Sequence, residues 1–299
     1  MTCETLIQLL SKILDPKWRH LWPSEFHFCG SDSEPLLAVD AVVPAIRFLL
    51  QRKRIIELVT NGLLLSEQKL MDIIPRIHKL HVSLDVTNDD DYRDFKLPDG
   101  NQNTKGYTTV LKNLECINNQ RQKLESPLKV KVSFVAIPDT FSAEKWNRCI
   151  ADLHGVGVNT IRVRNDLSGK FGNVSNLKEI VDRSADSYNG MIDIRIAAPD
   201  IAFSHDDFPY CRSPLLWPTL AADGALYPCA HTANSRFEPF GNLLAADSLI
   251  ELYQRLFGNA SNECLCVDLI GCKRACPPLI GSLNSPKTAI DMLGNSCYV

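Results

Sequence analysis

The sequence predicts an α/β protein whose mostly parallel β-sheet is followed by a smaller cysteine-rich domain. Over the first two-thirds of the chain, short segments rich in β-branched residues alternate with helical patterns of about 10 to 15 residues, which is typical of right-handed β-α-β crossovers. In the last third, four cysteines fall within thirteen residues, and three more flank them. We therefore expect a sheet domain over residues 1–199 and a cysteine-rich domain over residues 200–299.

The individual elements follow from hydrophobic periodicity. Residues 4–14 carry apolar side chains at helical spacing, and residues 55–60 form a β-branched run that ends in Asn61 and Gly62. The predicted strands are 25–29, 55–60, 81–85, 130–137, 160–164 and 191–197. The predicted helices are 4–14, 39–50, one that starts at Ser66, 107–120, 143–154 and 176–183. The polar residues 88–105 are expected to form a long loop, in which three consecutive aspartates are solvated rather than bound to a metal.

Length, composition and charge limit the possible partners. The chain has 299 residues, of which 45% are hydrophobic and 22% charged, and its net charge is -3. This charge provides no basic surface for nucleic acid and no polybasic membrane anchor, and no apolar run is long enough to cross a bilayer. Eleven cysteines without a secretory signal indicate a reducing compartment. We expect a cytoplasmic protein that acts on peptides or small molecules.

Ligands of a parallel sheet bind at the carboxyl ends of its strands. In this sequence polar turns follow the predicted strands at residues 30–35, 61–62, 85–105 and 165–173. Arg162 and Arg164 alternate with apolar residues on one strand and therefore share a face. They are candidates to bind a carboxylate of a cofactor or substrate, and a salt bridge at the sheet end is the alternative.

The cysteines indicate a metal or cluster site. Cys264, Cys266, Cys272 and Cys276 are too close in sequence to pair without strain, but thiolates at this spacing can converge on a metal. Zinc sites take four ligands each, whereas seven cysteines suit two iron-sulfur clusters with one position left to another group. The full set is Cys211, Cys229, Cys264, Cys266, Cys272, Cys276 and Cys297. Cys29, Cys116 and Cys149 are expected to be buried core residues.

The order of these seven cysteines resembles the SPASM domain, which is found at the C-terminus of radical SAM enzymes. In both, a glycine, here Gly224, stands shortly before the second cysteine. One departure is that only Leu265 separates Cys264 and Cys266, where the family usually has two residues. The resemblance implies one cluster held by Cys211, Cys229 and Cys276, and another held by Cys264, Cys266, Cys272 and Cys297. His205, six residues before Cys211, is a candidate fourth ligand of the first cluster, and a loop histidine beside an open iron is the alternative.

The first two-thirds of the chain resembles the radical SAM partial barrel. The run Ser31-Asp32-Ser33-Glu34-Pro35 stands where the family has Gly-Gly-Glu-Pro, whose backbone binds the amino group of S-adenosylmethionine. Ser33 replaces a usual glycine, which limits the backbone conformations available there. Asn61 resembles the end of the family's third strand. Ser83 and Asp85 resemble the end of the fourth, and the resemblance implies that Ser83 contacts the cofactor.

A radical SAM enzyme holds its active cluster on a Cys-x3-Cys-x2-Cys loop after the first strand. This sequence has only Cys3, at the place of the third cysteine. We expect that the chain begins inside this loop, so that the fold is a partial (β/α)6 barrel without its first strand. The alternative is that Cys3 is an incidental thiol and that the protein lacks the active cluster.

The resemblance implies a radical SAM/SPASM enzyme that cleaves S-adenosylmethionine to a 5'-deoxyadenosyl radical and modifies a peptide, a protein side chain or a small metabolite. It implies two auxiliary [4Fe-4S] clusters, a radical SAM cluster if the loop is completed, and an electron donor such as flavodoxin or ferredoxin. One alternative is a non-catalytic SPASM iron-sulfur protein that binds a peptide or a partner enzyme. Another is that zinc fills the cysteine sites.

Overall fold

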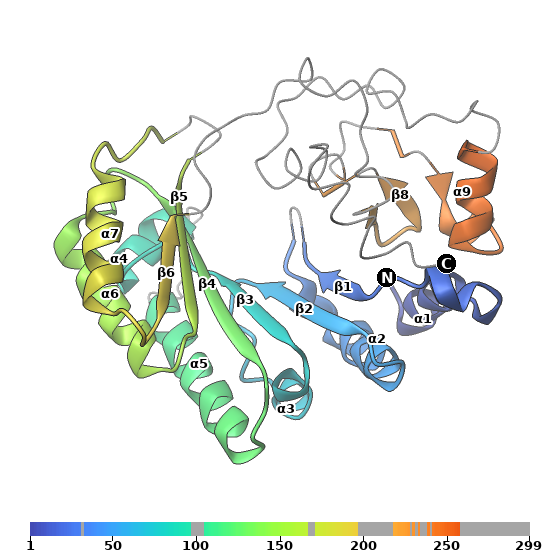
Figure 1. Cartoon of the computed structure of the whole chain (residues 1–299), viewed down its shortest axis with the longest axis horizontal. Helices are drawn as coiled ribbons and strands as arrows, with labels where there is room; N and C mark the ends of the chain where they lie inside the picture. The colour runs from blue at the N-terminus through green and yellow to red at the C-terminus, as the bar shows by residue number, and fades with distance from the viewer. Residues whose placement is uncertain are drawn as a thin grey trace. The chain divides into compact units, whose positions relative to one another are not determined.

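The computed structural model describes residues 1–30, 33–96, 105–166, 171–196, 218–227, 229–230, 233, 238–239 and 241–257 (Figure 1). The chain divides into two compact units: Ser24–Ala197, and Met1–Pro23 together with Ala198–Val299. We refer to them as the sheet unit and the terminal unit. The sequence led us to expect residues 1–23 in the first domain, whereas in the structure they group with the C-terminal residues.

The sheet unit contains a six-stranded parallel sheet whose strand order follows the chain order. This confirms the predicted α/β class. Its strands are β1 (Glu25–Phe28), β2 (Ile55–Thr60), β3 (Lys79–Ser83), β4 (Lys129–Ala136), β5 (Thr160–Asn165) and β6 (Asp193–Ile196). The largest shift from prediction is at β3, which begins and ends two residues earlier than expected.

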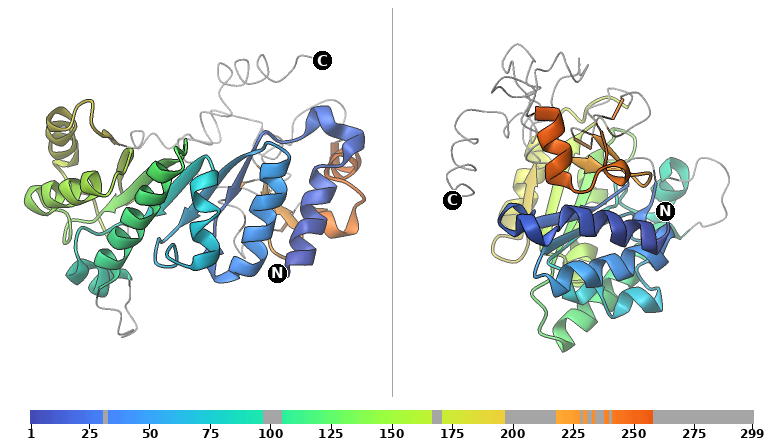
Figure 2. Two further views of the ribbon diagram at one scale, coloured as in Figure 1. Left: turned by 90° about the horizontal axis from the view of Figure 1, so that it is seen from below. Right: turned by 90° about the vertical axis from the view of Figure 1, so that its right-hand side faces the viewer.

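Helices cover one face of this sheet, and in the view from below they lie in front of the strands (Figure 2, left). They are α2 (Val39–Gln51), α3 (Gln68–Met71), α5 (Gly106–Lys123), α6 (Ala143–Gly155) and α7 (Leu177–Ser187). The 3-10 turns η2 (Pro35–Ala38) and η3 (Ile74–Arg76) lie before α2 and after α3. No helix in the described ranges is long and apolar enough to cross a membrane.

The core lies between the helices and alternate residues of the strands. On β4 every second residue is buried, because successive side chains of a strand point to opposite faces. Trp146 of α6 is fully buried, and its ring lies 5.2 Å from that of Phe134 in an edge-on arrangement. Ser142 caps α6, because its side chain accepts a hydrogen bond from the Lys145 amide.

The segment predicted as a long polar loop begins instead with helical turns. Asn88 caps α4 (Asp89–Asp91), and a π-helical turn, η4 (Tyr92–Lys96), follows. Asp91 is buried and pairs with Lys145 at 2.9 Å, while Asp89 accepts a hydrogen bond from the Thr108 amide at 3.0 Å. The aspartates are therefore acidic residues at a helix N-terminus, where the backbone amides favour negative charge.

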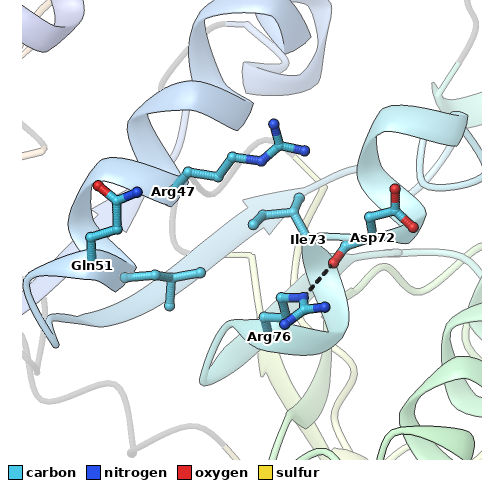
Figure 3. Close-up of a pocket in the computed structure, with 6 residues that line it drawn as sticks. Arg47, Gln51, Asp72, Ile73 and Arg76 are labelled. Carbon is cyan, nitrogen blue, oxygen red and sulfur yellow. Dashed lines mark hydrogen bonds between the residues drawn. The ribbon is translucent and has the colours of Figure 1, made fainter.

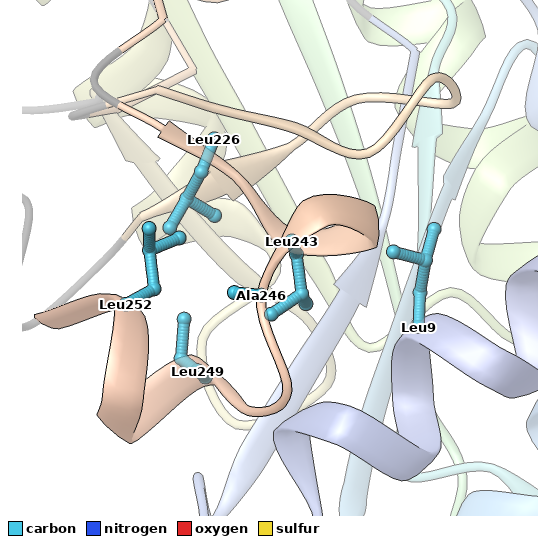
Figure 4. Close-up of a cluster of buried hydrophobic side chains, with 6 residues drawn as sticks. All are labelled: Leu9, Leu226, Leu243, Ala246, Leu249 and Leu252. Carbon is cyan, nitrogen blue, oxygen red and sulfur yellow. The ribbon is translucent and has the colours of Figure 1, made fainter.

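The terminal unit combines the N-terminal helix with C-terminal elements. Its helical segments are α1 (Cys3–Ile13), η1 (Pro16–Leu21), η6 (Leu243–Ala245) and α9 (Leu249–Phe257). Its strands β7 (Thr219–Leu220), β8 (Ala225–Tyr227) and β9 (Gly241–Asn242) form an antiparallel sheet. Figure 4 shows the small core that they share, which consists of Leu9, Leu226, Leu243, Ala246, Leu249 and Leu252.

Lys12 ties α1 to η6. Its ammonium donates hydrogen bonds to the carbonyl oxygens of Leu243 (3.1 Å), Leu244 (2.8 Å) and Ala246 (2.6 Å). Because hydrogen bonds from a charged donor contribute more than neutral ones, Lys12→Met is expected to lower the free energy of unfolding of this unit by about 2 kcal/mol.

Hydrogen exchange of the α9 amides measures this loss. Lys112→Met, on an exposed position of α5, is the control and should leave α9 unchanged. Equal protection of α9 in wild type and Lys12→Met would contradict the prediction.

Candidate functional site

The two faces of the parallel sheet differ in chemistry. Residues that pair in register share a face, so the strand pairings define three rows of side chains across the sheet on the face opposite the apolar core. We call these rows the polar face. They are Ser83, Ser133, Arg162 and Arg195 in the row nearest the carboxyl ends; His81, Lys131, Thr160 and Asp193 in the middle; and His27, Glu57, Lys79 and Lys129 nearest the amino ends.

The sequence produces this face by simple alternation. In β3 and β4, polar residues stand at every second position between buried aliphatic residues. Strands of parallel sheets are usually apolar on both faces. A face made of charged and hydroxyl side chains therefore marks a surface for ligands or chemistry. The same alternation is visible in the sequence, where it places Arg162 and Arg164 on one face.

Glu34 joins the ends of β1 and β2. Its Oε1 accepts hydrogen bonds from the Leu36 amide (3.0 Å) and the Thr60 hydroxyl (2.8 Å), and its Oε2 accepts one from the Asn61 amide (2.7 Å). The structure thus brings together two residues that the sequence singled out 27 positions apart, Glu34 and Asn61.

Asp85 forms a second polar centre at the end of β3. Its Oδ1 accepts a hydrogen bond from the Val135 amide (3.0 Å), and its Oδ2 accepts one from the Ser83 hydroxyl (2.9 Å). Lys96 pairs with the same carboxylate at 3.0 Å and also donates to the Ser83 carbonyl at 2.7 Å. Asp85 has a φ of 59°, which an aspartate adopts more readily than most residues. Lys96 was not singled out in the sequence.

Tyr92 is a buried tyrosine near both carboxylates, Glu34 and Asp85. Its side chain is buried, and burial raises its pKa first, followed by the negative charges of Glu34 and Asp85. Its ring packs against Gly106, where a Cβ atom would lie 2.3 Å from the ring. Only glycine fits this position without displacing Tyr92. Glu34, Asn61, Ser83, Asp85, Tyr92 and Lys96 form what we call the carboxyl-edge cluster.

The turn before Glu34 is tight. A Cβ atom on Gly30 would lie 1.7 Å from the carbonyl oxygen of Ser33, so the backbone closes on itself where only glycine fits. Ser33 is exposed, and Pro35 begins η2. Ser31 and Asp32 lie outside the residues that the structure describes.

Arg162 and Arg164 are both exposed, and their strand places them on the same face as Ser133. Within the described ranges neither arginine forms a hydrogen bond or an ion pair. The salt bridge considered as an alternative is thus not formed among these residues, and the role of both arginines stays a prediction.

A buried charge network joins the middle row of the polar face to the row nearest the amino ends. Glu57 is 6% exposed. Its Oε1 lies 3.0 Å from Lys131 Nζ and 3.5 Å from His81 Nδ1. Its Oε2 lies 3.5 Å from His27 Nδ1. Burial acts to raise the pKa of Glu57, but the hydrogen bond with His81 and the Lys131 charge outweigh it, and the pKa is about 2. The pKa of His81 is lowered, chiefly by burial. At neutral pH Glu57 is therefore ionised and His81 neutral.

Glu25, His27 and Glu57 place three potential metal-ligating atoms within 4.8 Å of one another. Lys79 already pairs with Glu25 at 2.6 Å, and Lys131 pairs with Glu57 at 3.0 Å. A metal ion would have to compete with these two ammonium groups. We therefore assign the trio to the charge network and not to a metal site.

Two of the expected iron-sulfur ligands lie in described parts of the chain, both in the terminal unit. Cys3 is the partly exposed first residue of α1, and Cys229 is buried two residues after β8. The remaining expected ligands, His205, Cys211, Cys264, Cys266, Cys272, Cys276 and Cys297, lie outside the described residues. Their convergence on clusters stays a prediction.

Of the three cysteines expected in the core, only Cys149 is buried there. Cys29 and Cys116 are exposed, so this prediction was wrong for them. Cys29 lies beyond the last residue of β1, and Cys116 lies on α5 between the buried residues Leu114 and Ile117 but outside their buried face.

A pocket lies among the helices and away from the polar face (Figure 3). Arg47 and Gln51 of α2 face Asp72, Ile73 and Arg76 across it, and Arg76 Nε donates a hydrogen bond to the Asp72 carbonyl at 3.0 Å. It contains none of the residues of the carboxyl-edge cluster or the charge network, so we do not assign it a role in the site.

Comparison with known proteins identifies the fold. No family model and no curated protein sequence matches the chain. Among solved structures, Streptococcus suis SuiB is similar with a TM-score of 0.60 and 14% identity, over 96% of this chain and 68% of SuiB.

A second structure of SuiB, bound to its precursor peptide SuiA, has a TM-score of 0.59 and 13% identity over 96% and 67% of the two chains. Native anSMEcpe with bound AdoMet has a TM-score of 0.57 and 14% identity over 85% and 71%. These neighbours are radical SAM enzymes. The chain therefore has the partial-barrel fold of the radical SAM enzymes.

Proposed function

We propose that this protein is a radical SAM enzyme that binds S-adenosylmethionine at the carboxyl-edge cluster and modifies a peptide. The observation that carries the proposal is the Glu34 carboxylate, whose three hydrogen bonds hold the turn after β1 against the end of β2. This arrangement lies at the strand ends where parallel α/β folds bind their ligands. Two of the structural neighbours were solved with S-adenosylmethionine bound.

The charges at this edge suit the ligand. S-adenosylmethionine carries an ammonium, a sulfonium and a carboxylate group. Glu34 offers negative charge at the end of β1, while Arg162 and Arg164 are exposed cations on the same face as Ser133. Asp85, at the end of β3, is already paired with Lys96. Opposite charges at close range favour binding of each group in one orientation.

The iron-sulfur groups belong to the same proposal. Thiolates are the ligands that these clusters take: the cysteines of residues 211–297 would hold the auxiliary clusters, and Cys3 would supply one of the three thiolates of the radical SAM cluster. When bound, such a cluster provides the electron that cleaves S-adenosylmethionine. The auxiliary set follows the division expected from the sequence, and a flavodoxin or ferredoxin serves as electron donor.

A peptide is the substrate class that we favour. The structure of SuiB bound to its precursor peptide supports this choice, because SuiB has a similar fold over 96% of this chain and 67% of its own. The polar face supports it too, because charged and hydroxyl side chains in regular rows can bind the amides and side chains of a peptide. We place the reaction in the cytoplasm, where the thiolates stay reduced.

The test uses the protein with an added N-terminal segment that completes the Cys-x3-Cys-x2-Cys loop, because Cys3 alone cannot hold the radical SAM cluster. Binding of S-adenosylmethionine to this extended protein is measured after anaerobic reconstitution. Glu34→Gln removes the negative charge and replaces one carboxylate oxygen with an NH2 group, so that the bond from either Thr60 or Asn61 loses its acceptor. The affinity for S-adenosylmethionine is therefore expected to fall by about tenfold to thirtyfold, equivalent to about 1.5 to 2 kcal/mol. Glu67→Gln, at an exposed position before α3, is the matched control and should bind as wild type does.

No binding by wild type, or equal affinity of Glu34→Gln, would overturn the proposed binding site. Under reducing conditions the extended protein should also release 5'-deoxyadenosine. Binding without this product would favour a non-catalytic iron-sulfur protein. Zinc without acid-labile sulfide in the purified protein would overturn the cluster assignment.

A further inference from the structure

Three residues on adjacent strands form a chain of hydrogen-bonding groups across the polar face. Ser133 of β4 and His81 of β3 are joined by a hydrogen bond of 2.8 Å between Oγ and Nε2. On the other side of the imidazole, Nδ1 lies 3.5 Å from Oε1 of Glu57 on β2. A hydroxyl, an imidazole and a carboxylate in this order are the groups that enzymes use to move a proton.

The charge on Glu57 determines the tautomer of His81. A carboxylate accepts hydrogen bonds only, so the imidazole proton belongs on Nδ1, which faces Glu57. Nε2 then carries a lone pair, and the Ser133 hydroxyl donates to it. In this state His81 is ready to accept a proton from the side of Ser133.

The groups around His81 keep this state at neutral pH. Glu57 faces it from β2, Lys131 and Ser133 from β4, and Asp85 from beyond the end of its own strand. Burial and the Lys131 charge disfavour the imidazolium, while Glu57 and Asp85 favour it. A neutral imidazole suits a general base when a neighbouring carboxylate stabilises the imidazolium that protonation produces.

The position of Ser133 connects this chain to the carboxyl-edge cluster. Ser133 pairs in register with Ser83, whose hydroxyl bonds to Asp85, and with Arg162 on the other side. Its backbone carbonyl is engaged by the Leu84 amide at 3.1 Å. Ser133 lies within β4, where the backbone amides serve the sheet, so this position suits proton transfer better than acyl transfer, which needs amides free to bind an oxyanion.

We infer that Ser133, His81 and Glu57 form a proton-accepting relay for a substrate bound on the polar face. The substrate gives a proton to Ser133 Oγ while the Ser133 hydroxyl proton passes to His81 Nε2, and Glu57 stays ionised beside the resulting imidazolium. The inference rests on the proposed function. A substrate that has lost a hydrogen atom to the 5'-deoxyadenosyl radical must lose one electron, to an iron-sulfur cluster, and one proton to form a closed-shell product.

The first test needs no substrate. Nitrogen chemical shifts of the His81 ring in the full-length protein report its tautomer and its titration. We expect a neutral ring with the proton on Nδ1 at pH 7, and a lower pKa in Glu57→Gln, because the variant lacks the charge that stabilises the imidazolium. A proton on Nε2, or a doubly protonated ring at pH 7, would overturn the relay.

The second test uses the extended protein with the completed cysteine loop, a pooled library of synthetic peptides and reducing conditions. Modified peptide is recognised by a mass lower by two hydrogens. His81→Gln and Ser133→Ala are each expected to lower the yield of modified peptide about a hundredfold, while release of 5'-deoxyadenosine changes by less than about threefold. His154→Gln, an exposed histidine on α6, is the control and should modify peptide as wild type does.

The outcomes separate the relay from the proposed function. Wild-type yield of modified peptide in His81→Gln would overturn the relay alone. An extended protein without substitutions that releases no 5'-deoxyadenosine would overturn the proposed function and the relay with it. If it releases 5'-deoxyadenosine but modifies no peptide, the proposed substrate class is overturned, and the titration of His81 then decides the relay.

Discussion

Glu57→Gln is expected to lower the free energy of unfolding by about 3 kcal/mol at pH 7. The wild-type carboxylate is 6% exposed and lies beside Lys131, His81 and His27. Replacing it with a neutral amide of the same shape leaves the Lys131 charge partly buried without its counter-charge. Urea denaturation of the reduced protein under anaerobic conditions measures the loss.

The same variant should reveal the pH dependence of the wild type. The pKa of Glu57 is about 2 in the folded protein against 4.5 ordinarily. Because the folded-state pKa is lowered, the stabilisation is fully present above pH 4.5 and is lost as the pH falls toward 2. After allowance for solvent screening this amounts to about 2 kcal/mol. The difference in free energy of unfolding between wild type and Glu57→Gln should therefore decrease as the pH is lowered from 5 to 3.

Glu144→Gln is the matched control for both measurements. Its carboxylate is exposed and pairs with Arg148 on the surface of α6, so the substitution should change stability by less than about 0.5 kcal/mol. Equal free energies of unfolding for wild type and Glu57→Gln at pH 7 would contradict the assigned network. So would a difference at pH 3 as large as that at pH 7.

Trp146→Ala is expected to lower the free energy of unfolding by about 4 kcal/mol, because it removes a fully buried ring from the core behind β4. The rings of Phe134 and Phe141 lie 5.2 Å and 5.1 Å from it and would face the resulting cavity. Phe134 adjoins Ser133 on β4, so the same packing positions the strand that carries the proposed relay.

Two further variants test this prediction. Within the described residues Trp146 Nε1 has no hydrogen-bond partner, so Trp146→Phe keeps an aromatic ring, loses no hydrogen bond and should cost only about 1 to 2 kcal/mol. Leu124→Ala, at a half-exposed position after α5, should cost less than about 1 kcal/mol. Equal midpoints for Trp146→Ala and Leu124→Ala in urea would show that the Trp146 core does not hold the sheet unit together.

Local pattern was sufficient for the framework of the sheet unit. The strands before Asn61 and Ser83, and the turn before Glu34, were predictable because hydrophobic periodicity and polar strand ends are properties of short stretches of chain. The parallel order followed from the alternation of strands and helices. Resemblance to short family motifs predicted roles for Glu34, Asn61, Ser83 and Asp85. The structure joins them by hydrogen bonds in two pairs, Glu34 with Asn61 and Ser83 with Asp85.

Relations between distant segments were harder to predict. The sequence suggested a polar loop over residues 88–105, yet the first part of this segment is helical because Asn88 caps it and Lys145, from a later helix, neutralises Asp91. Cys29 and Cys116 could not be placed from composition alone, because a single position at the end of a strand or along a helix decides whether a thiol faces the core.

The sequence by itself determined the α/β class, the parallel sheet, the strand ends that carry the carboxyl-edge cluster and the seven-cysteine pattern, since each of these is written in local order and spacing. Only the tertiary structure decided that Glu57, His81 and Ser133 meet, and that α1 shares a core with β8 and α9. The physical reason is that the register between strands, and the packing of segments more than two hundred residues apart, depend on contacts that no local stretch of sequence contains.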